Sequence, residues 1–144
     1  MTEFSEYGYV NFKTIKEPWN EYKLKDGSTL IIRFIMIKFS IGEDTKNVLG
    51  LKITSENIVG ILAAPELRGD PETMRYTADE LASSIVDDDI DFEEVRESWS
   101  EYVLEDGRRL FFKPVLTKVS RTDKLDISGD PIYLTQTQLL TKTG

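Results

Sequence analysis

Alternation of apolar and polar residues is clearest between Tyr22 and Lys25. Tyr22 and Leu24 alternate with lysines, which predicts a strand with one apolar face. Asp26-Gly27 follows and predicts a hairpin with a two-residue type I′ turn. The return strand, 28–39, is apolar on both faces, so we expect both faces to be covered.

The same pattern occurs again in the second half of the chain, at an offset of 80. Between 10–40 and 90–120 the offset holds without a gap, and eleven of the 31 paired positions are identical. The identical pairs include Trp19/Trp99, Glu21/Glu101, Tyr22/Tyr102 and Gly27/Gly107. We interpret the chain as a tandem duplication.

Other segments give further predictions, first for helices. Phe92, Val95 and Trp99 have helical spacing after Asp91, so we expect a short helix at 92–98 and an equivalent one at 12–17. Thr77 and Glu80 form a capping box for a helix of two to three turns that reaches Ile85. The run 87–89 of three aspartates is expected to end that helix.

The remaining segments predict loops and paired strands. Polar loops are expected at 41–47 and 121–126, and the offset becomes 81 after them. Each copy then reads as strand, tight polar turn and strand, with turns at 55–57 and 136–138. Pro114 predicts an edge or a bulge in the long strand of the second copy.

Together these elements predict a mainly β protein with short helices, of the α+β class. We expect a small β-barrel unit in two copies, packed with pseudo-twofold symmetry. Repeat one, with a short N-terminal helix, occupies 1–64. A linker with a short helix occupies 65–89, and repeat two occupies 90–144.

Segment 24–30 (LKDGSTL), followed about 30 residues later by 56–61 (ENIVGI), resembles the strand-turn-strand spacing of Sm-like small barrels. The resemblance covers 12–63 and 92–142 as strand order. It implies a barrel that opens with a short helix and contains a long, bent second strand. The RNA-contacting Asp and Asn of that family are not recognisable here, so we take architecture from the resemblance and no function.

Charge and residue content narrow the functional classes. With 18 basic and 26 acidic residues the net charge is −8, which disfavours binding to a phosphate backbone. The chain has no cysteine and no histidine, so disulfides, thiolate sites and histidine chemistry are excluded. No apolar run would span a membrane and the N-terminus lacks a signal-peptide pattern, so we expect a cytoplasmic protein without cofactor or metal.

The repeated aromatic residues are the first candidates for a site. Trp19, Tyr22, Trp99 and Tyr102 could form twin recognition grooves, because exposed Trp and Tyr dominate interface hot spots. The alternative, which we favour, is that they anchor each helix to its barrel.

The repeated acids and an acidic cluster are further candidates. Glu21 and Glu101 could form a carboxylate pair with acid–base capability. The interpretation that we favour is that each satisfies a backbone amide or pairs with Lys38 or Lys118. The acids of segment 87–94 offer oxygen ligands, but their spacing departs from a calcium loop, and a solvated linker is the better interpretation.

We therefore expect a non-enzymatic interaction or structural protein that binds a protein partner or itself. One alternative is a carboxylate-based or divalent-metal-dependent enzyme at the interface of the copies. Another is a single-strand nucleic-acid binder that stacks bases on Tyr22 and Tyr102 beside Lys38 and Lys118.

Overall fold

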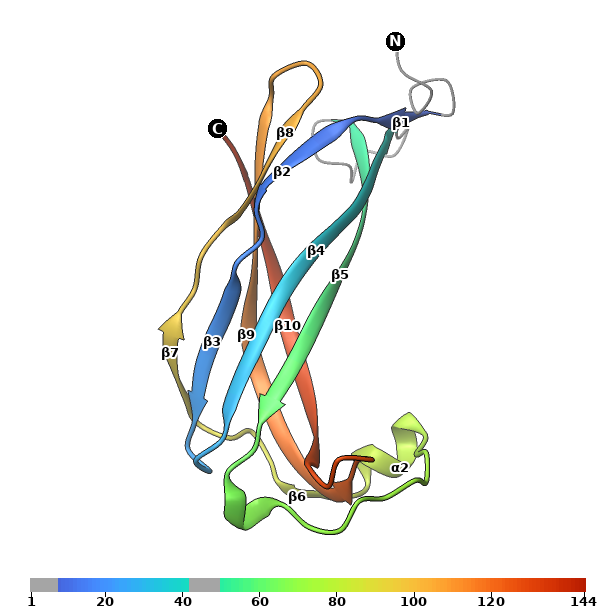
Figure 1. Ribbon diagram of the computed structural model, residues 1–144, viewed down its shortest axis with the longest axis vertical. Coiled ribbons are helices and arrows are strands. Elements are labelled where there is room, and N and C mark those ends of the chain that lie inside the picture. The colour runs from blue at the N-terminus through green and yellow to red at the C-terminus, as the bar shows by residue number, and fades with distance from the viewer. Residues whose placement is uncertain (1–7, 42–49) are drawn as a thin grey trace.

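The computed structural model describes residues 8–41 and 50–144 (Figure 1). Strands account for 63% of these residues and helices for 6%, so the mainly β fold is confirmed. The strands are β1 (Tyr9–Val10), β2 (Phe12–Lys16), β3 (Trp19–Leu24), β4 (Thr29–Ile41), β5 (Leu51–Leu62), β6 (Ile85–Asp87), β7 (Phe92–Arg96), β8 (Ser100–Leu104), β9 (Arg109–Leu125) and β10 (Pro131–Thr143). The helices are the 3₁₀ turn η1 (Pro65–Leu67) and α2 (Ala78–Ala82).

The strands form two curled antiparallel sheets that exchange short strands. One sheet has the order β1-β4-β3-β7, with β5 also on β4; the other has the order β10-β9-β8-β2, with β6 also on β9. β2 pairs with β8, with Phe12 opposite Leu104, and β7 pairs with β3, with Phe92 opposite Leu24. These two registers differ by 80 residues on both strands, and each half of the chain contributes a strand to the sheet of the other half.

Two apolar clusters lie between the sheets, and each draws residues from both halves of the chain. One comprises Phe34, Met36, Phe39, Leu51, Tyr102, Leu104, Leu110 and Phe112. The other comprises Tyr22, Leu24, Leu30, Ile32, Ile90, Leu116 and Val119. Burial of each such side chain stabilises the fold by roughly 1.5–3 kcal/mol. Because each cluster contains side chains from both halves, neither half would keep an intact cluster without the other.

The predicted helices at 12–17 and 92–98 are wrong, because these segments are the strands β2 and β7. Their helical spacing of apolar residues does not produce a buried face, since Ile15 and Val95 are about half exposed. Pairing with β8 and β3 gives hydrogen-bond partners to backbone groups at the edges of these strands that would otherwise have none. The free energy gained by this pairing outweighs the weak helical preference of the short segments.

The hairpin at Asp26-Gly27 is confirmed, but its turn type is not. Gly27 has φ +92° while Asp26 is not left-handed, whereas a type I′ turn needs positive φ at both central residues. The Gly27 amide donates to the Leu24 carbonyl at 3.0 Å, and the Leu24 amide donates to the Ser28 carbonyl at 2.9 Å. The loop therefore has three residues and ends on a left-handed glycine.

The two expected long strands are present as β4 and β9, and each contains a bulge. In β4 the inward row is buried up to Met36, and a register shift between Met36 and Lys38 then returns Phe39 to the core. The other face is less covered, and Ile37 is about half exposed. Pro114 in β9 lies where neither β8 nor β6 pairs, which agrees with the predicted edge position.

One predicted loop and two predicted turns are wrong. The expected loop at 121–126 is strand as far as Leu125, and no turn interrupts β5 or β10 at 55–57 or 136–138. The long partner strands β4 and β9 supply a continuous ladder, so the polar residues remain extended and a bulge absorbs the irregularity. Residues 42–47 of the other expected loop lie outside the described residues.

The segment between the halves covers one end of the sandwich (Figure 1). The predicted capping box is present, since the Thr77 hydroxyl accepts from the Glu80 amide at 3.1 Å and the Thr77 amide donates to the Glu80 carboxylate at 3.2 Å. However, α2 ends at Ala82 and Ile85 begins β6, so the helix is shorter than expected and the aspartates do not end it. Residues from Ile85 onward pair with β9 as strand β6, so they cannot extend the helix.

Candidate functional site

Trp19 and Trp99 lie half-buried in similar surroundings. Trp19 opens β3, and the Arg33 guanidinium carbon lies 5.9 Å from its ring centroid. Trp99 directly precedes β8, and the Nζ atoms of Lys113 and Lys142 lie 4.9 and 4.4 Å from its ring centroid. Arg33 and Lys113 are 80 residues apart, as Trp19 and Trp99 are, so each tryptophan has a cation at the matching sequence position.

A glutamate beside each cation connects these surfaces to the core. Glu17 lies 3.9 Å from Arg33, and Glu97 lies 3.9 Å from Lys113. The Tyr102 hydroxyl donates to Glu17 at 2.5 Å, and the Tyr22 hydroxyl donates to Glu97. Each bond therefore joins the two halves of the chain, in a reciprocal arrangement.

Tyr22 and Tyr102 are completely buried, so their rings offer no surface to a partner or a nucleic-acid base in this structure. Burial raises the pKa of both phenols far above the ordinary value, and the hydrogen bonds to the glutamates raise the pKa further. These tyrosines fix the packing of the two sheets.

Glu21 and Glu101 each lie beside an arginine. Glu21 is 3.7 Å from Arg96, and Glu101 accepts a hydrogen bond from Arg109. The expected lysine partners contact other groups: Lys38 lies 5.0 Å from the Tyr9 ring centroid, and Lys118 lies 3.7 Å from Asp88.

The sequence interpretation missed a different pair of carboxyl groups, Glu94 and Glu97. The pKa of Glu94 is raised, first because its carboxyl hydrogen-bonds with that of Glu97. Glu97 belongs to a repeated pair, Glu17/Glu97, and that identity is the signal that could have identified it. Glu94 is exposed, whereas the Glu97 side chain is 12% exposed and lies 3.9 Å from Lys113.

An internal polar network surrounds Asp26 in the first hairpin. Its carboxylate accepts from the Tyr133 hydroxyl at 2.6 Å, from Arg121 at 2.9 Å and from the Ser28 amide at 2.9 Å. Burial opposes ionisation, but these hydrogen bonds outweigh it and lower the pKa of Asp26. Burial and the bond to Asp26 raise the pKa of Tyr133 to about 12.

The acidic cluster at 87–94 does not gather metal ligands. No group of three or more acidic side chains among the described residues could hold a metal ion. Asp88 instead accepts from the Ser120 hydroxyl at 2.7 Å, and Asp87 lies 3.5 Å from Arg121.

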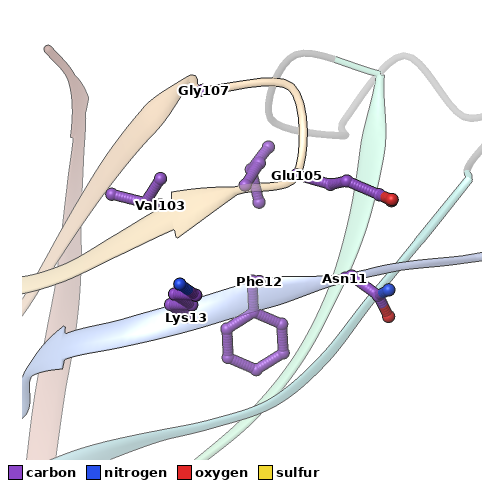
Figure 2. Close-up of a pocket in the computed structure, with 7 residues that line it drawn as sticks. Asn11, Phe12, Lys13, Val103, Glu105 and Gly107 are labelled. Atoms are coloured by element: carbon purple, nitrogen blue, oxygen red, sulfur yellow. The ribbon is translucent and has the colours of Figure 1, made fainter.

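Two hollows occupy equivalent places where the exchanged strands meet. One, of about 570 Å³, lies between β2 and the β8–β9 hairpin, with Phe12, Lys13 and Glu105 in its lining (Figure 2). The other, of about 350 Å³, is lined by the corresponding Phe92, Glu93 and Lys25. Both are open. The first has one carboxyl side chain in its lining, Glu105, and the second has two, Asp91 and Glu93, beside Lys23 and Lys25.

The sheet edges differ sharply in length and charge. The edge strands β2 and β7 have five residues each, with two and three charged side chains respectively. Within the described part of the chain, β5 pairs with β4 alone and β10 with β9 alone. These edges have 12 and 13 residues, and their charged residues are Lys52, Glu56 and Lys142.

No family model, curated protein or solved structure matches this chain. The resemblance to Sm-like barrels therefore stays a prediction. Among the described residues, no helix has the length and apolar character needed to cross a membrane. The expected cytoplasmic location also stays a prediction.

Proposed function

We propose that this protein is a non-enzymatic interaction protein that associates with itself through its sheet edges. The observation that supports the proposal is the pair of long edges on β5 and β10, which have 12 and 13 residues and three charged side chains between them. An uncovered edge presents unpaired backbone N–H and C=O groups that pair readily with another strand.

The contrast with the other two edges strengthens the proposal. Proteins protect exposed edges by shortening them and by placing charged side chains on them. β2 and β7 follow this rule, since charged residues make up two and three of their five positions. β5 and β10 do not follow it, as expected for edges that are covered in the functional state.

Sedimentation velocity and light scattering on the full chain, from about 1 µM to about 1 mM, test this proposal. We expect the mass to rise from 16.5 kDa towards twice that value with concentration. A constant mass of 16.5 kDa over the whole range would refute self-association.

A protein partner is the second candidate, and the tryptophan surfaces favour it. Trp and Arg are enriched in interface hot spots, and Trp19 with Arg33 repeats as Trp99 with Lys113. A partner retained by the wild type and lost from the Trp19→Ala/Trp99→Ala double variant, with the fold intact by circular dichroism, would support this candidate. Equal retention by both proteins would argue against it.

The enzyme and nucleic-acid alternatives have less support. Glu21 and Glu101 each lie beside an arginine, which is typical of a structural ion pair on a protein surface. Replacing both by glutamine should therefore change stability alone. Nucleic-acid binding would need stacking surfaces other than the buried Tyr22 and Tyr102.

We also infer that the two halves arose by duplication and are related by a pseudo-twofold axis. The matching registers of β2 with β8 and of β7 with β3 support this, as do the reciprocal Tyr–Glu bonds. In β10 the register matches that of β5 with an offset of 82 instead of the 81 expected from the sequence: Thr54 lies opposite Lys38, and Gln136 lies opposite Lys118. The small-barrel fold of each unit and the unit boundaries 1–64 and 90–144 stay predictions.

A further inference from the structure

We propose that two copies of the chain pair antiparallel through the first half of β5, with a twofold axis at Thr54. The paired segment is 51–57, so the strands of two molecules join into one continuous sheet. This inference rests on the proposed self-association and names the surface that mediates it.

The first half of β5 lies to one side of a side-chain contact that joins the two long edges. The Asn57 side chain donates to the Thr137 hydroxyl at 3.3 Å, which links β5 to β10 near the middle of both strands. On the N-terminal side of this contact β5 diverges from β10 (Figure 1). Lys52 and Glu56 are exposed there, and within the described residues this stretch pairs with β4 alone.

Charge selects the register. Opposite residues of an antiparallel pair point to the same face, so a symmetric pair must have its axis at a residue. An axis at Thr54 places Lys52 of each copy opposite Glu56 of the other, which gives two favourable pairs. An axis at Glu56 would place two like charges opposite each other. β10 has no acid to pair with its one charged residue, Lys142.

The overall charge permits antiparallel pairing at this place. Segment 64–91 contains nine acidic and two basic residues, a net of −7 out of −8 for the whole chain. It begins beyond the C-terminal end of β5, ten residues from the axis. At about 3.3 Å per residue the two acidic segments lie on the order of 65 Å apart, far beyond the Debye length of about 8 Å.

A cysteine at the axis tests the geometry, because the natural chain has no cysteine. Opposite Cα atoms in antiparallel strands lie about 4.5–5.5 Å apart, within the range of disulfides. Thr54→Cys should form a disulfide-linked dimer under mild oxidation at least roughly tenfold faster than Gln136→Cys, the matched position in β10. Equal rates, with both variants folded, would overturn the proposal.

Charge reversal tests the register independently. Lys52→Glu or Glu56→Lys alone should weaken the dimer roughly tenfold or more, because two favourable pairs become two repulsive ones. The double variant should restore it. If the wild type associates and neither single reversal weakens it, this pairing is wrong while self-association stands. If the wild type stays monomeric and Thr54→Cys shows no preference over its control, both proposals fail.

Discussion

Replacing Asn20 and Ser100 by alanine, one at a time, compares two equivalent buried positions with opposite hydrogen-bond outcomes. Asn20 is fully buried; its Nδ2 donates to the Pro114 carbonyl at 3.2 Å, and its Oδ1 accepts from the Ser98 amide at 2.8 Å. Ser100, which lies 80 residues further along the chain, is also buried, but its hydroxyl has no hydrogen bond of ordinary geometry. The residue equivalent to Ser98 is Pro18, which has no amide hydrogen to donate.

These contacts set the magnitudes. Asn20→Ala leaves the Ser98 amide and the Pro114 carbonyl unpaired, and each orphaned group costs about 1–3 kcal/mol. We therefore expect a loss of about 2–6 kcal/mol in the free energy of unfolding. Ser100→Ala removes a hydroxyl that is already unpaired, so we expect no loss, or a gain of up to about 1 kcal/mol.

Urea unfolding followed by tryptophan fluorescence measures both values, because Trp19 and Trp99 adjoin these positions. The slope m should not change, so the difference appears as a shift in midpoint. A loss below about 0.5 kcal/mol for Asn20→Ala, or equal losses for the two variants, would show that these hydrogen bonds do not set the stability of the two sites.

Three further predictions concern pH and backbone geometry. The pKa values of Tyr22 and Tyr102 are raised in the folded state, so the stability that depends on their protonated form should be fully present below pH of about 10. Above that pH the free energy of unfolding should fall by up to about 1.4 kcal/mol per pH unit for each tyrosine. Replacing both tyrosines by phenylalanine should flatten this loss, as measured by urea unfolding at alkaline pH. The lowered pKa of Asp26 gives stability that is present above pH of about 4 and lost as pH falls, and Asp26→Asn should lower the neutral-pH stability and remove this part of the acid dependence. Gly129→Ala should cost more in thermal unfolding than Gly50→Ala, because both have positive φ but a Cβ at Gly129 would collide with the backbone oxygen of Gly69; equal costs would contradict this.

The candidate site was only partly readable from the sequence. Identity between the repeats singled out Trp19 and Trp99, which have equivalent cations beside them. Glu17 and Glu97 are also identical at the offset of 80, but their structural role depends on hydrogen bonds to tyrosines of the opposite half. No local pattern shows that a glutamate contacts a tyrosine 75 or 85 residues away, because that contact exists once the two sheets pack.

The mainly β character, the Asp-Gly hairpin, the long strand after it and the helix cap at Thr77 could all be read from the amino-acid sequence. Each of these depends on alternation or on contacts within a few residues, and local chemistry is sufficient to encode them. Helical spacing gave the wrong conformation for 12–17 and 92–98, since a five-residue segment has no strong preference of its own. Their strand conformation depends on the open edges of β8 and β3, which belong to the other half of the chain and become available in the folded molecule.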